Sequence, residues 1–140
     1  VVSLAHDVII VIGIYSLFWG IMPFSMEIDQ SFIAAILTVI GYSVNDSVII
    51  FDRIREFLPL YRKRATRDVL NLAVNDTLSR TVNTGVTTIL VLIMMFFFGG
   101  TTIRGFLFAM IIGVIVGTYS SIFIGTTLVY DTSSKAGLKM

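Results

Sequence analysis

Four long segments of this chain contain almost no charged side chains, and this feature limits the possible folds most strongly. Residues 8–26, 82–103 and 105–130 contain no Asp, Glu, Lys or Arg, and residues 31–51 contain only Asp46. A helix needs about 20 apolar residues to cross the roughly 30 Å hydrocarbon core of a bilayer. The sequence therefore predicts an all-α membrane protein, an antiparallel transmembrane helix bundle with spans at about residues 1–22, 31–51, 78–98 and 103–130.

The composition disfavours several other classes of protein. Hydrophobic residues make up 56% of the chain and charged residues 14%, whereas about 25% is usual in soluble domains. Without cysteine and with one histidine, the chain has neither a disulfide framework nor a His/Cys metal cluster, and we expect no cofactor. The net charge of +1 gives no basis for binding nucleic acid, which needs a concentrated basic surface. An enzyme is a remote alternative, because no Ser-His-Asp spacing or metal motif is present.

Basic residues are concentrated on one side of the predicted membrane. Residues 52–77 contain six Arg or Lys and residues 131–140 contain two, whereas the connections between the other spans contain only Arg104. By the positive-inside rule, we predict that residues 52–77 form a cytoplasmic loop and residues 131–140 a cytoplasmic tail. The two short connections then lie outside.

One part of the predicted loop has an amphipathic pattern. Pro59 interrupts an otherwise helical stretch, and apolar residues with helical spacing follow Thr66, namely Val69, Leu70, Ala73 and Val74. This pattern predicts a short helix lying at the membrane interface. A solvated basic loop is the alternative.

The chain opens on Val1-Val2-Ser3-Leu4, inside the first predicted span. It has no initiator Met, no basic n-region and no small-residue cleavage site, so it does not read as a signal peptide. We expect the first helix to be part of a longer polypeptide.

Small residues recur at every fourth position of the last predicted span. They are Gly105, Ala109, Gly113, Gly117, Ser121 and Gly125. This spacing places small side chains along one face of the helix and allows the backbone of a neighbouring helix to approach closely. We predict that this face is a packing seam.

Polar side chains occur at a similar depth in all four predicted spans. A charged side chain near the centre of a membrane helix costs about 2.5–3.5 kcal/mol on insertion scales and usually faces the bundle interior. With a rise of about 1.5 Å per residue, Asp7, Asp46 and Asn83 lie roughly 22 Å from the outer edge, Ser120 about 25 Å and Arg80 about 27 Å. We predict a polar layer in the cytoplasmic half, formed by Tyr42, Asn45, Asn83, Thr84 and Ser120 around these ionisable groups.

Asp46 and Arg80 are the strongest candidates for chemistry within this layer. The proton affinity of an Asp that faces an Arg at low dielectric depends on whether the pair is made or broken, as a proton carrier requires. We predict a proton relay of Asp46 and Arg80, joined by His6 and Asp7. The alternatives are a salt bridge that only fixes helix register, an Arg80 that snorkels to the interface, and a local His6–Asp7 pair that stabilises the bundle.

A long motif gives these residues a family context. Residues 29–56 read DQSFIAAILTVIGYSVNDSVIIFDRIRE, and they are preceded by Ala5-His6-Asp7 and followed by NDTLSRT at residues 75–81. These motifs, in this order, resemble those of SecF in the SecD/SecF family of bacterial protein-export membrane proteins. The resemblance covers nearly the whole chain.

The resemblance implies a half of the resistance-nodulation-division (RND) transporter type that lacks its first helix and its periplasmic domain. It also implies a part of the SecDF accessory complex, which couples proton flow across the bacterial cytoplasmic (inner) membrane to Sec-dependent protein export. The implied partners are SecD, separate or fused, the SecYEG translocon, the translocating preprotein and membrane lipid. By motif match, Asp46 takes the place of the essential intramembrane carboxylate and Arg80 that of the essential arginine.

Two points remain open at the level of sequence. Four predicted spans are one fewer than the five that follow the periplasmic domain in this family. The alternative functions are a structural or interaction helix bundle and half of a small-molecule RND efflux transporter. Substitution of Asp46 is expected to separate these functions.

Overall fold

The computed structural model describes residues 1–61 and 63–135, with side chains described as far as residue 132, and this part of the chain is helical without strands. The long helices are α1 (Val2–Leu17), α2 (Gln30–Leu60), α3 (Thr66–Phe98), α4 (Arg104–Ser120) and α5 (Thr126–Lys135). A 3-10 turn (Thr101–Ile103) precedes α4, and a π-helical turn (Ser121–Gly125) joins α4 to α5. The prediction of an all-α membrane bundle is confirmed.

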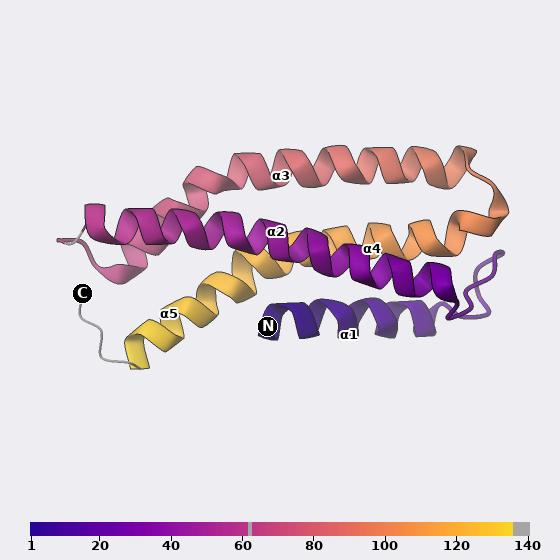
Figure 1. Cartoon of the computed structure of the whole chain (residues 1–140), viewed down its shortest axis with the longest axis horizontal. Coiled ribbons are helices and arrows are strands. Elements are labelled where there is room, and N and C mark those ends of the chain that lie inside the picture. Colours follow the sequence, from indigo (N-terminus) through magenta and orange to yellow (C-terminus); the bar gives the residue numbers. More distant parts are fainter. Residues whose placement is uncertain (62, 136–140) are drawn as a thin grey trace.

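The helices run antiparallel in succession, so α2 and α4 point in the same direction (Figure 1). These two helices form the central pair, and α1 and α3 each pack against both of them. The bundle core joins apolar residues of all four helices, among them Val11, Val39, Leu92 and Val114.

Within the described residues, three helical segments are long and apolar enough to cross a membrane: Gln30–Leu60, Thr66–Phe98 and the continuous stretch Thr101–Thr132. The first predicted span differs from the structure, because α1 has 16 residues and ends at Leu17 instead of continuing to residue 22. Gly20 has φ +80°, a left-handed conformation that glycine adopts without steric cost, and the chain turns there. Where the membrane surfaces cut the helices remains a prediction.

The predicted loop at residues 52–77 is mostly helical. α2 continues to Leu60 and α3 begins at Thr66, so only residues 61–65 connect them. Pro59 lies in the last turn of α2 and does not interrupt it. The predicted separate amphipathic helix is the first part of α3, because its buried residues Leu70 and Ala73 pack against α2 instead of facing a membrane surface.

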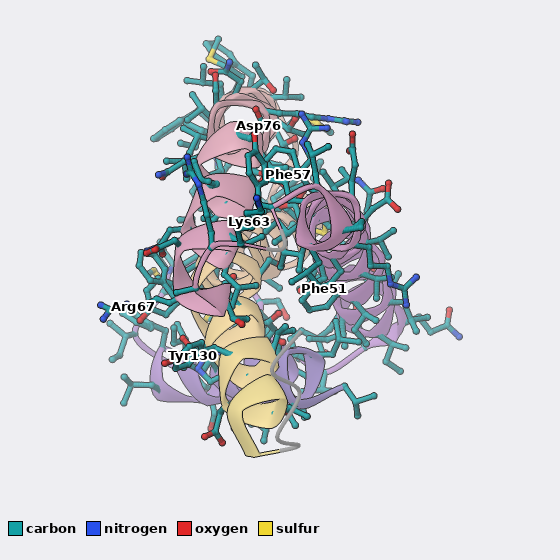
Figure 2. All side chains as sticks on the ribbon, turned by 90° about the vertical axis from the view of Figure 1, so that its left-hand side faces the viewer. Phe51, Phe57, Lys63, Arg67, Asp76 and Tyr130 are labelled. Carbon is teal, nitrogen blue, oxygen red and sulfur yellow. The ribbon has the colours of Figure 1, made fainter. Side chains whose placement is uncertain are left out.

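Ile50 and Ile54 of α2 complete this contact with Leu70 and Ala73, and we call these four residues the inner apolar cluster. Arg53 donates hydrogen bonds to Asp76 of α3 (2.5 Å) and to Glu56 (2.6 Å), and its guanidinium lies 4.7 Å from the centre of the Phe57 ring. Figure 2 views this end of the molecule, with Phe57 and Asp76 between α2 and α3. The two helices therefore form a hairpin that is tightly packed near its connecting end.

From Gly113 onward, the predicted small-residue seam packs against α2, whereas Gly105 at its start faces the Tyr15 hydroxyl of α1 and the Ser25 backbone. Gly113 faces Val39, Gly117 faces Ser43, and Gly125 faces Phe51, while the hydroxyls of Ser121 and Ser47, 74 positions apart, lie within 3.1 Å. The four pairs share this offset, as expected for two parallel helices in constant register. The seam thus explains why the backbones of α2 and α4 approach closely.

Substitution of Gly113 tests the seam. A Cβ at Gly113 would overlap the branched side chain of Val39, whereas a Cβ at Gly41 would meet nothing within 4 Å. Because overpacking costs about 1–3 kcal/mol, we expect Gly113→Ala to lower the free energy of unfolding by this amount in detergent. Gly41→Ala is the control and should leave stability unchanged or slightly raised. Equal effects of the two substitutions would contradict the seam.

Candidate functional site

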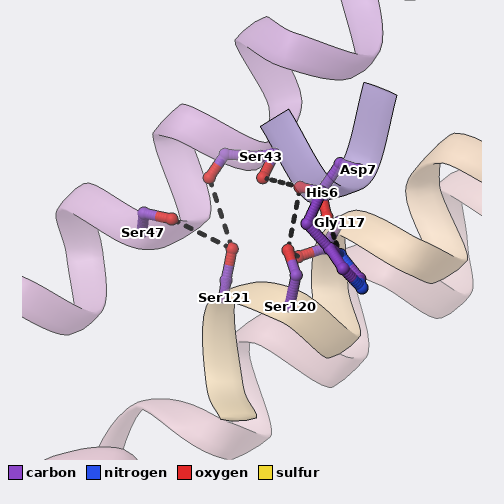
Figure 3. Close-up of polar contacts among 7 residues, drawn as sticks. All are labelled: His6, Asp7, Ser43, Ser47, Gly117, Ser120 and Ser121. Atoms are coloured by element: carbon purple, nitrogen blue, oxygen red, sulfur yellow. Dashed lines mark hydrogen bonds and ion pairs between the residues drawn. The ribbon is translucent and has the colours of Figure 1, made fainter. Parts of the chain in front are cut away.

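A cluster of bonded polar side chains lies between α1, α2 and α4, and we call it the Asp7 cluster: His6, Asp7, Ser43, Ser47, Ser120 and Ser121 (Figure 3). Asp7 is 1% exposed. Its Oδ2 accepts hydrogen bonds from the Ser43 hydroxyl (2.7 Å) and the Ser120 hydroxyl (2.8 Å), and its Oδ1 lies 3.2 Å from Nδ1 of His6. Both oxygens of this carboxylate therefore have partners.

The local sequence explains why Asp7 is buried. Asp7 shares the four-residue spacing of Ser3, Val11 and Tyr15, which form the buried face of α1. On α2, Ser43 belongs to the face that the seam of α4 covers, and Gly117 brings the α4 backbone close to it. The carboxylate consequently meets two hydroxyls and the His6 ring, away from solvent.

The π-helical turn Ser121–Gly125 borders the Asp7 cluster. While Ser120 bonds to Asp7 of α1, its neighbour Ser121 donates to the Ser43 backbone oxygen of α2 (3.3 Å). Beyond the turn, α5 diverges from the axis of α4 (Figure 1). Such turns are rare and bend helices, frequently at functional sites.

A second group of polar side chains lies on α2, α3 and α4, and few of its members are bonded to one another. This Asp46 cluster consists of Tyr42, Asp46, Thr81 and Thr118. Asp46 and Thr81 are 1% and 2% exposed. Among the described residues, Oδ2 of Asp46 and the Thr81 hydroxyl are buried without a hydrogen-bond partner. The Tyr42 and Thr118 hydroxyls lie close enough to interact with each other.

Gly85 of α3 lies beside two members of the Asp46 cluster. A Cβ at Gly85 of α3 would lie 3.3 Å from the Thr118 hydroxyl and 3.5 Å from the Tyr42 hydroxyl. Because α2 and α3 are antiparallel, one turn along α2 from Tyr42 and one turn back along α3 from Gly85 bring Asp46 to the level of Thr81. The Asp46 cluster thus extends over about one helical turn.

Arg80 lies outside this cluster. It is exposed on α3, yet it is near enough to act electrostatically on Asp46. The ion pairs within 4.0 Å among the described side chains join other residues, so the expected direct contact of Asp46 with Arg80 is not made. Arg80 is next to the buried Thr81 in sequence and therefore points about 100° away from it.

The predicted polar layer is only partly assembled inside the chain. Ser120 is buried and Tyr42 is half-buried, whereas Asn45, Asn83 and Thr84 are exposed. The Thr84 hydroxyl donates to the backbone oxygen of Arg80 (2.9 Å). The rise along a helix gave the depth of these residues but not the side of the helix on which they lie.

Sequence reasoning missed Thr81 and Thr118 as members of the interior, and it assigned Ser121 only to packing. Thr77, Thr81 and Gly85 follow one another at four-residue spacing on the buried face of α3, and this spacing is a weak signal in the sequence. No comparable spacing in the sequence points to Thr118. In the part of the chain that the structure describes, no three His, Cys, Asp or Glu side chains form a metal site.

Buried carboxylates inside a bundle of apolar, membrane-length helices define a class of protein, the polytopic membrane proteins with a polar interior. Residues 1–135 match the family described as "Protein export membrane protein SecD/SecF, C-terminal". The chain belongs to this family, and the resemblance noted in its motifs is confirmed.

Individual relatives support the same family assignment. Over 139 residues, the chain is 50% identical to the protein translocase subunit SecF of Rhodothermus marinus. The aligned region covers 99% of this chain and 45% of that protein. It is 47% identical over 131 residues to SecF of Haemophilus influenzae, covering 94% of this chain and 38% of that protein. The chain thus spans less than half the length of these relatives.

A solved structure shows the same fold. The crystal structure of SecDF, a translocon-associated membrane protein from Thermus thermophilus, matches with a TM-score of 0.83 and 44% identity, covering 95% of this chain and 18% of that chain. Together with the membrane-length helices, this match supports the predicted multi-pass location in the cytoplasmic membrane.

Proposed function

We propose that this chain is the membrane part of a SecF subunit that acts with SecD and the Sec translocon in protein export. In this proposal Asp46 carries the proton whose flow across the membrane drives the export. The observation that carries the proposal is the Asp46 carboxylate, which is 1% exposed and whose Oδ2 has no hydrogen-bond partner among the described residues.

The contrast with Asp7 supports this assignment. A buried polar group without a partner costs about 1–3 kcal/mol, and more if it is charged. Asp7 avoids this cost through Ser43 and Ser120, whereas Asp46 does not. Ionisable groups within membrane helices mark proton and ion pathways, and their protonation changes the forces between helices.

Arg80 supplies the coupling to movement. Protonation of Asp46 removes its attraction to Arg80, and release of the proton restores it. Since Arg80 acts on Asp46 from outside direct contact, a shift of α3 against α2 changes their distance. The small-residue seam allows α4 to slide along α2 as this movement occurs. His6 and Asp7 remain predicted members of the relay, and a bonded anchor is the alternative role for Asp7.

The exposed polar residues of α2 and α3 favour a further protein surface beside this chain. Arg80, Asn83 and Asn45 are exposed, although each lies in a segment apolar enough to span the membrane. Polar side chains facing lipid are costly, so we propose that SecD covers this side.

The well-bonded Asp7 cluster favours the second candidate function, a scaffold whose polar groups only stabilise packing.

Infrared titration of the full-length protein in lipid vesicles tests the proposal. We expect a carboxyl band whose intensity falls as the pH rises, which is absent in Asp46→Asn and whose midpoint shifts in Arg80→Ala. Asp52→Asn, an exposed acid six residues further along α2, is the control and should retain the band. An Asp46 that stays in one protonation state throughout, with or without Arg80, would favour the scaffold.

A further inference from the structure

A pocket of about 470 Å³ lies at the predicted outer end of the bundle, and we call it the outer pocket. Its lining comes from α1, from the connection between α1 and α2, and from the start of α4. The N-terminal ends of α2 and α4 lie at this same end of the molecule (Figure 1). Ligand sites in proteins commonly enclose about 300–1,000 Å³, so the outer pocket is large enough to hold a ligand group.

The charges of the outer pocket favour a cation. Glu27 and Asp29 are exposed and line it, whereas none of its described lining residues is Lys, Arg, His, Asn or Gln. The N-terminal end of a helix carries roughly +0.5 of an elementary charge, so the ends of α2 and α4 together offset about one of the two carboxylates. A negative charge of about one unit remains, and the other polar side chains of the lining are hydroxyls.

Both carboxylates can still accept hydrogen bonds from a ligand. Oδ1 of Asp29 caps α2 by accepting a hydrogen bond from the Phe32 N–H (2.9 Å), which leaves Oδ2 available. The ion pairs within 4.0 Å among the described side chains involve neither Glu27 nor Asp29. Arg104, the basic residue nearest in sequence to the α4 part of the lining, does not line the pocket. The two acids are therefore open to a cation from elsewhere.

A buried hydroxyl faces the outer pocket without a partner. Tyr15 lines the pocket and is 4% exposed, and no hydrogen bond joins its hydroxyl to another described residue. Its ring packs against the rings of Phe32 and Phe108, with centroids 4.4 and 6.4 Å away, and these contacts fix its direction. Asp29 is near enough to act electrostatically on this hydroxyl. A ligand that Asp29 binds can therefore also reach the Tyr15 hydroxyl.

Aromatic rings complete the outer pocket. Phe24 and Phe106 line it and are half-buried, and edge contacts hold the Phe24 ring against Phe96 and Phe108, at centroid distances of 5.6 and 5.9 Å. The face of an aromatic ring attracts a cation, so an organic cation can use both the rings and the carboxylates. Ca²⁺ instead needs about six to eight oxygen ligands, and no three His, Cys, Asp or Glu side chains of the described chain form a metal site.

We propose that the outer pocket binds a basic side chain, arginine or lysine, which a protein segment presents at the outer surface of the membrane. A guanidinium group has five N–H donors and no acceptor, and it stacks on aromatic rings as well as binding carboxylates. The pocket lies at the ends of α2 and α4, the central pair of the bundle, and this position favours a protein segment above the membrane over a lipid headgroup at the flank. The inference does not depend on the proposed function, because the outer pocket contains no member of the Asp46 cluster.

Photo-cross-linking in the full-length SecD–SecF assembly, in lipid vesicles with a translocating preprotein, tests the inference. The photo-cross-linker p-benzoylphenylalanine replaces Thr102, an exposed residue of the pocket, and mass spectrometry locates the adduct. We expect an adduct next to an arginine or lysine, whose position shows whether the segment belongs to the same polypeptide, to SecD or to the preprotein. An adduct with lipid alone, or no adduct at all, would overturn the inference.

Neutral variants test the role of the acids. Glu27→Gln with Asp29→Asn should lower the yield of the adduct on the order of 10-fold, because two attractions to the cation are lost. Asparagine caps a helix about as well as aspartate, so α2 should keep its start. Asp52→Asn, which removes an exposed acid in the opposite half of α2, is the control and should leave the yield unchanged.

A smaller change keeps the test decisive if the double variant fails to fold. Tyr15→Phe removes one hydroxyl and keeps the ring contacts, so it should lower the yield of the adduct while the bundle stays intact. A yield that is unchanged in every folded variant of Glu27, Asp29 and Tyr15 would overturn the inference. Loss of the adduct on addition of EDTA would also overturn it, since a metal ion would then occupy the pocket.

Discussion

Replacing Asp46 by asparagine in the full-length protein is expected to abolish the proton-driven part of protein export. Asparagine has nearly the shape of aspartate, so the fit between α2, α3 and α4 should be kept. It cannot take up or release a proton, however, and its interaction with Arg80 no longer changes. The stimulation of export by the proton gradient should therefore fall to the level measured without the subunit.

The measurement is preprotein translocation into vesicles, with and without a proton gradient. Asp52→Asn removes an exposed charge on the same helix and should leave the stimulation unchanged. Asp7→Asn separates the two roles of Asp7, because a relay member should lose the stimulation and an anchor should lose only stability. Undiminished stimulation in a correctly folded Asp46→Asn protein would exclude the carrier role.

Removing both hydroxyls that bind Asp7 should strongly destabilise the bundle. Ser43 and Ser120 donate to the same carboxylate oxygen, Oδ2, at 2.7 and 2.8 Å. Hydrogen bonds to charged groups contribute about 1.5–3 kcal/mol each, so Ser43→Ala with Ser120→Ala should lower the free energy of unfolding by roughly 3–6 kcal/mol. Detergent-based unfolding of the purified protein measures this difference.

Two further variants identify the cause of that loss. Ser16→Ala changes an exposed serine of α1 and should leave stability within about 0.5 kcal/mol. Adding Asp7→Leu to the double variant removes the buried carboxylate whose Oδ2 has lost both donors, and should restore part of the stability, because replacing buried charged groups by apolar residues is often neutral or stabilising. A double variant as stable as Ser16→Ala would show that Asp7 does not depend on these hydroxyls.

The sequence predicted the small-residue seam but not its partner. Regular spacing of glycine and serine is visible along one helix, whereas the choice of α2 as the helix that meets it depends on how the helices assemble. The hairpin of α2 and α3 illustrates the same limit. The basic residues of this region indicated a loop. In the structure both helices continue into it, because Leu70 and Ala73 of α3 are buried against Ile50 and Ile54 of α2.

By itself, the sequence determined that this chain forms apolar helices of membrane length, that ionisable groups lie within them, and that it carries the motifs of its family. These properties depend on residue type and on distance along one helix. Only the tertiary structure decided that Asp7 is fully bonded, that Asp46 is buried without a partner, and that Arg80 faces outward. Rotation by about 100° per residue sends neighbouring side chains in different directions, and packing between helices decides what each of them meets.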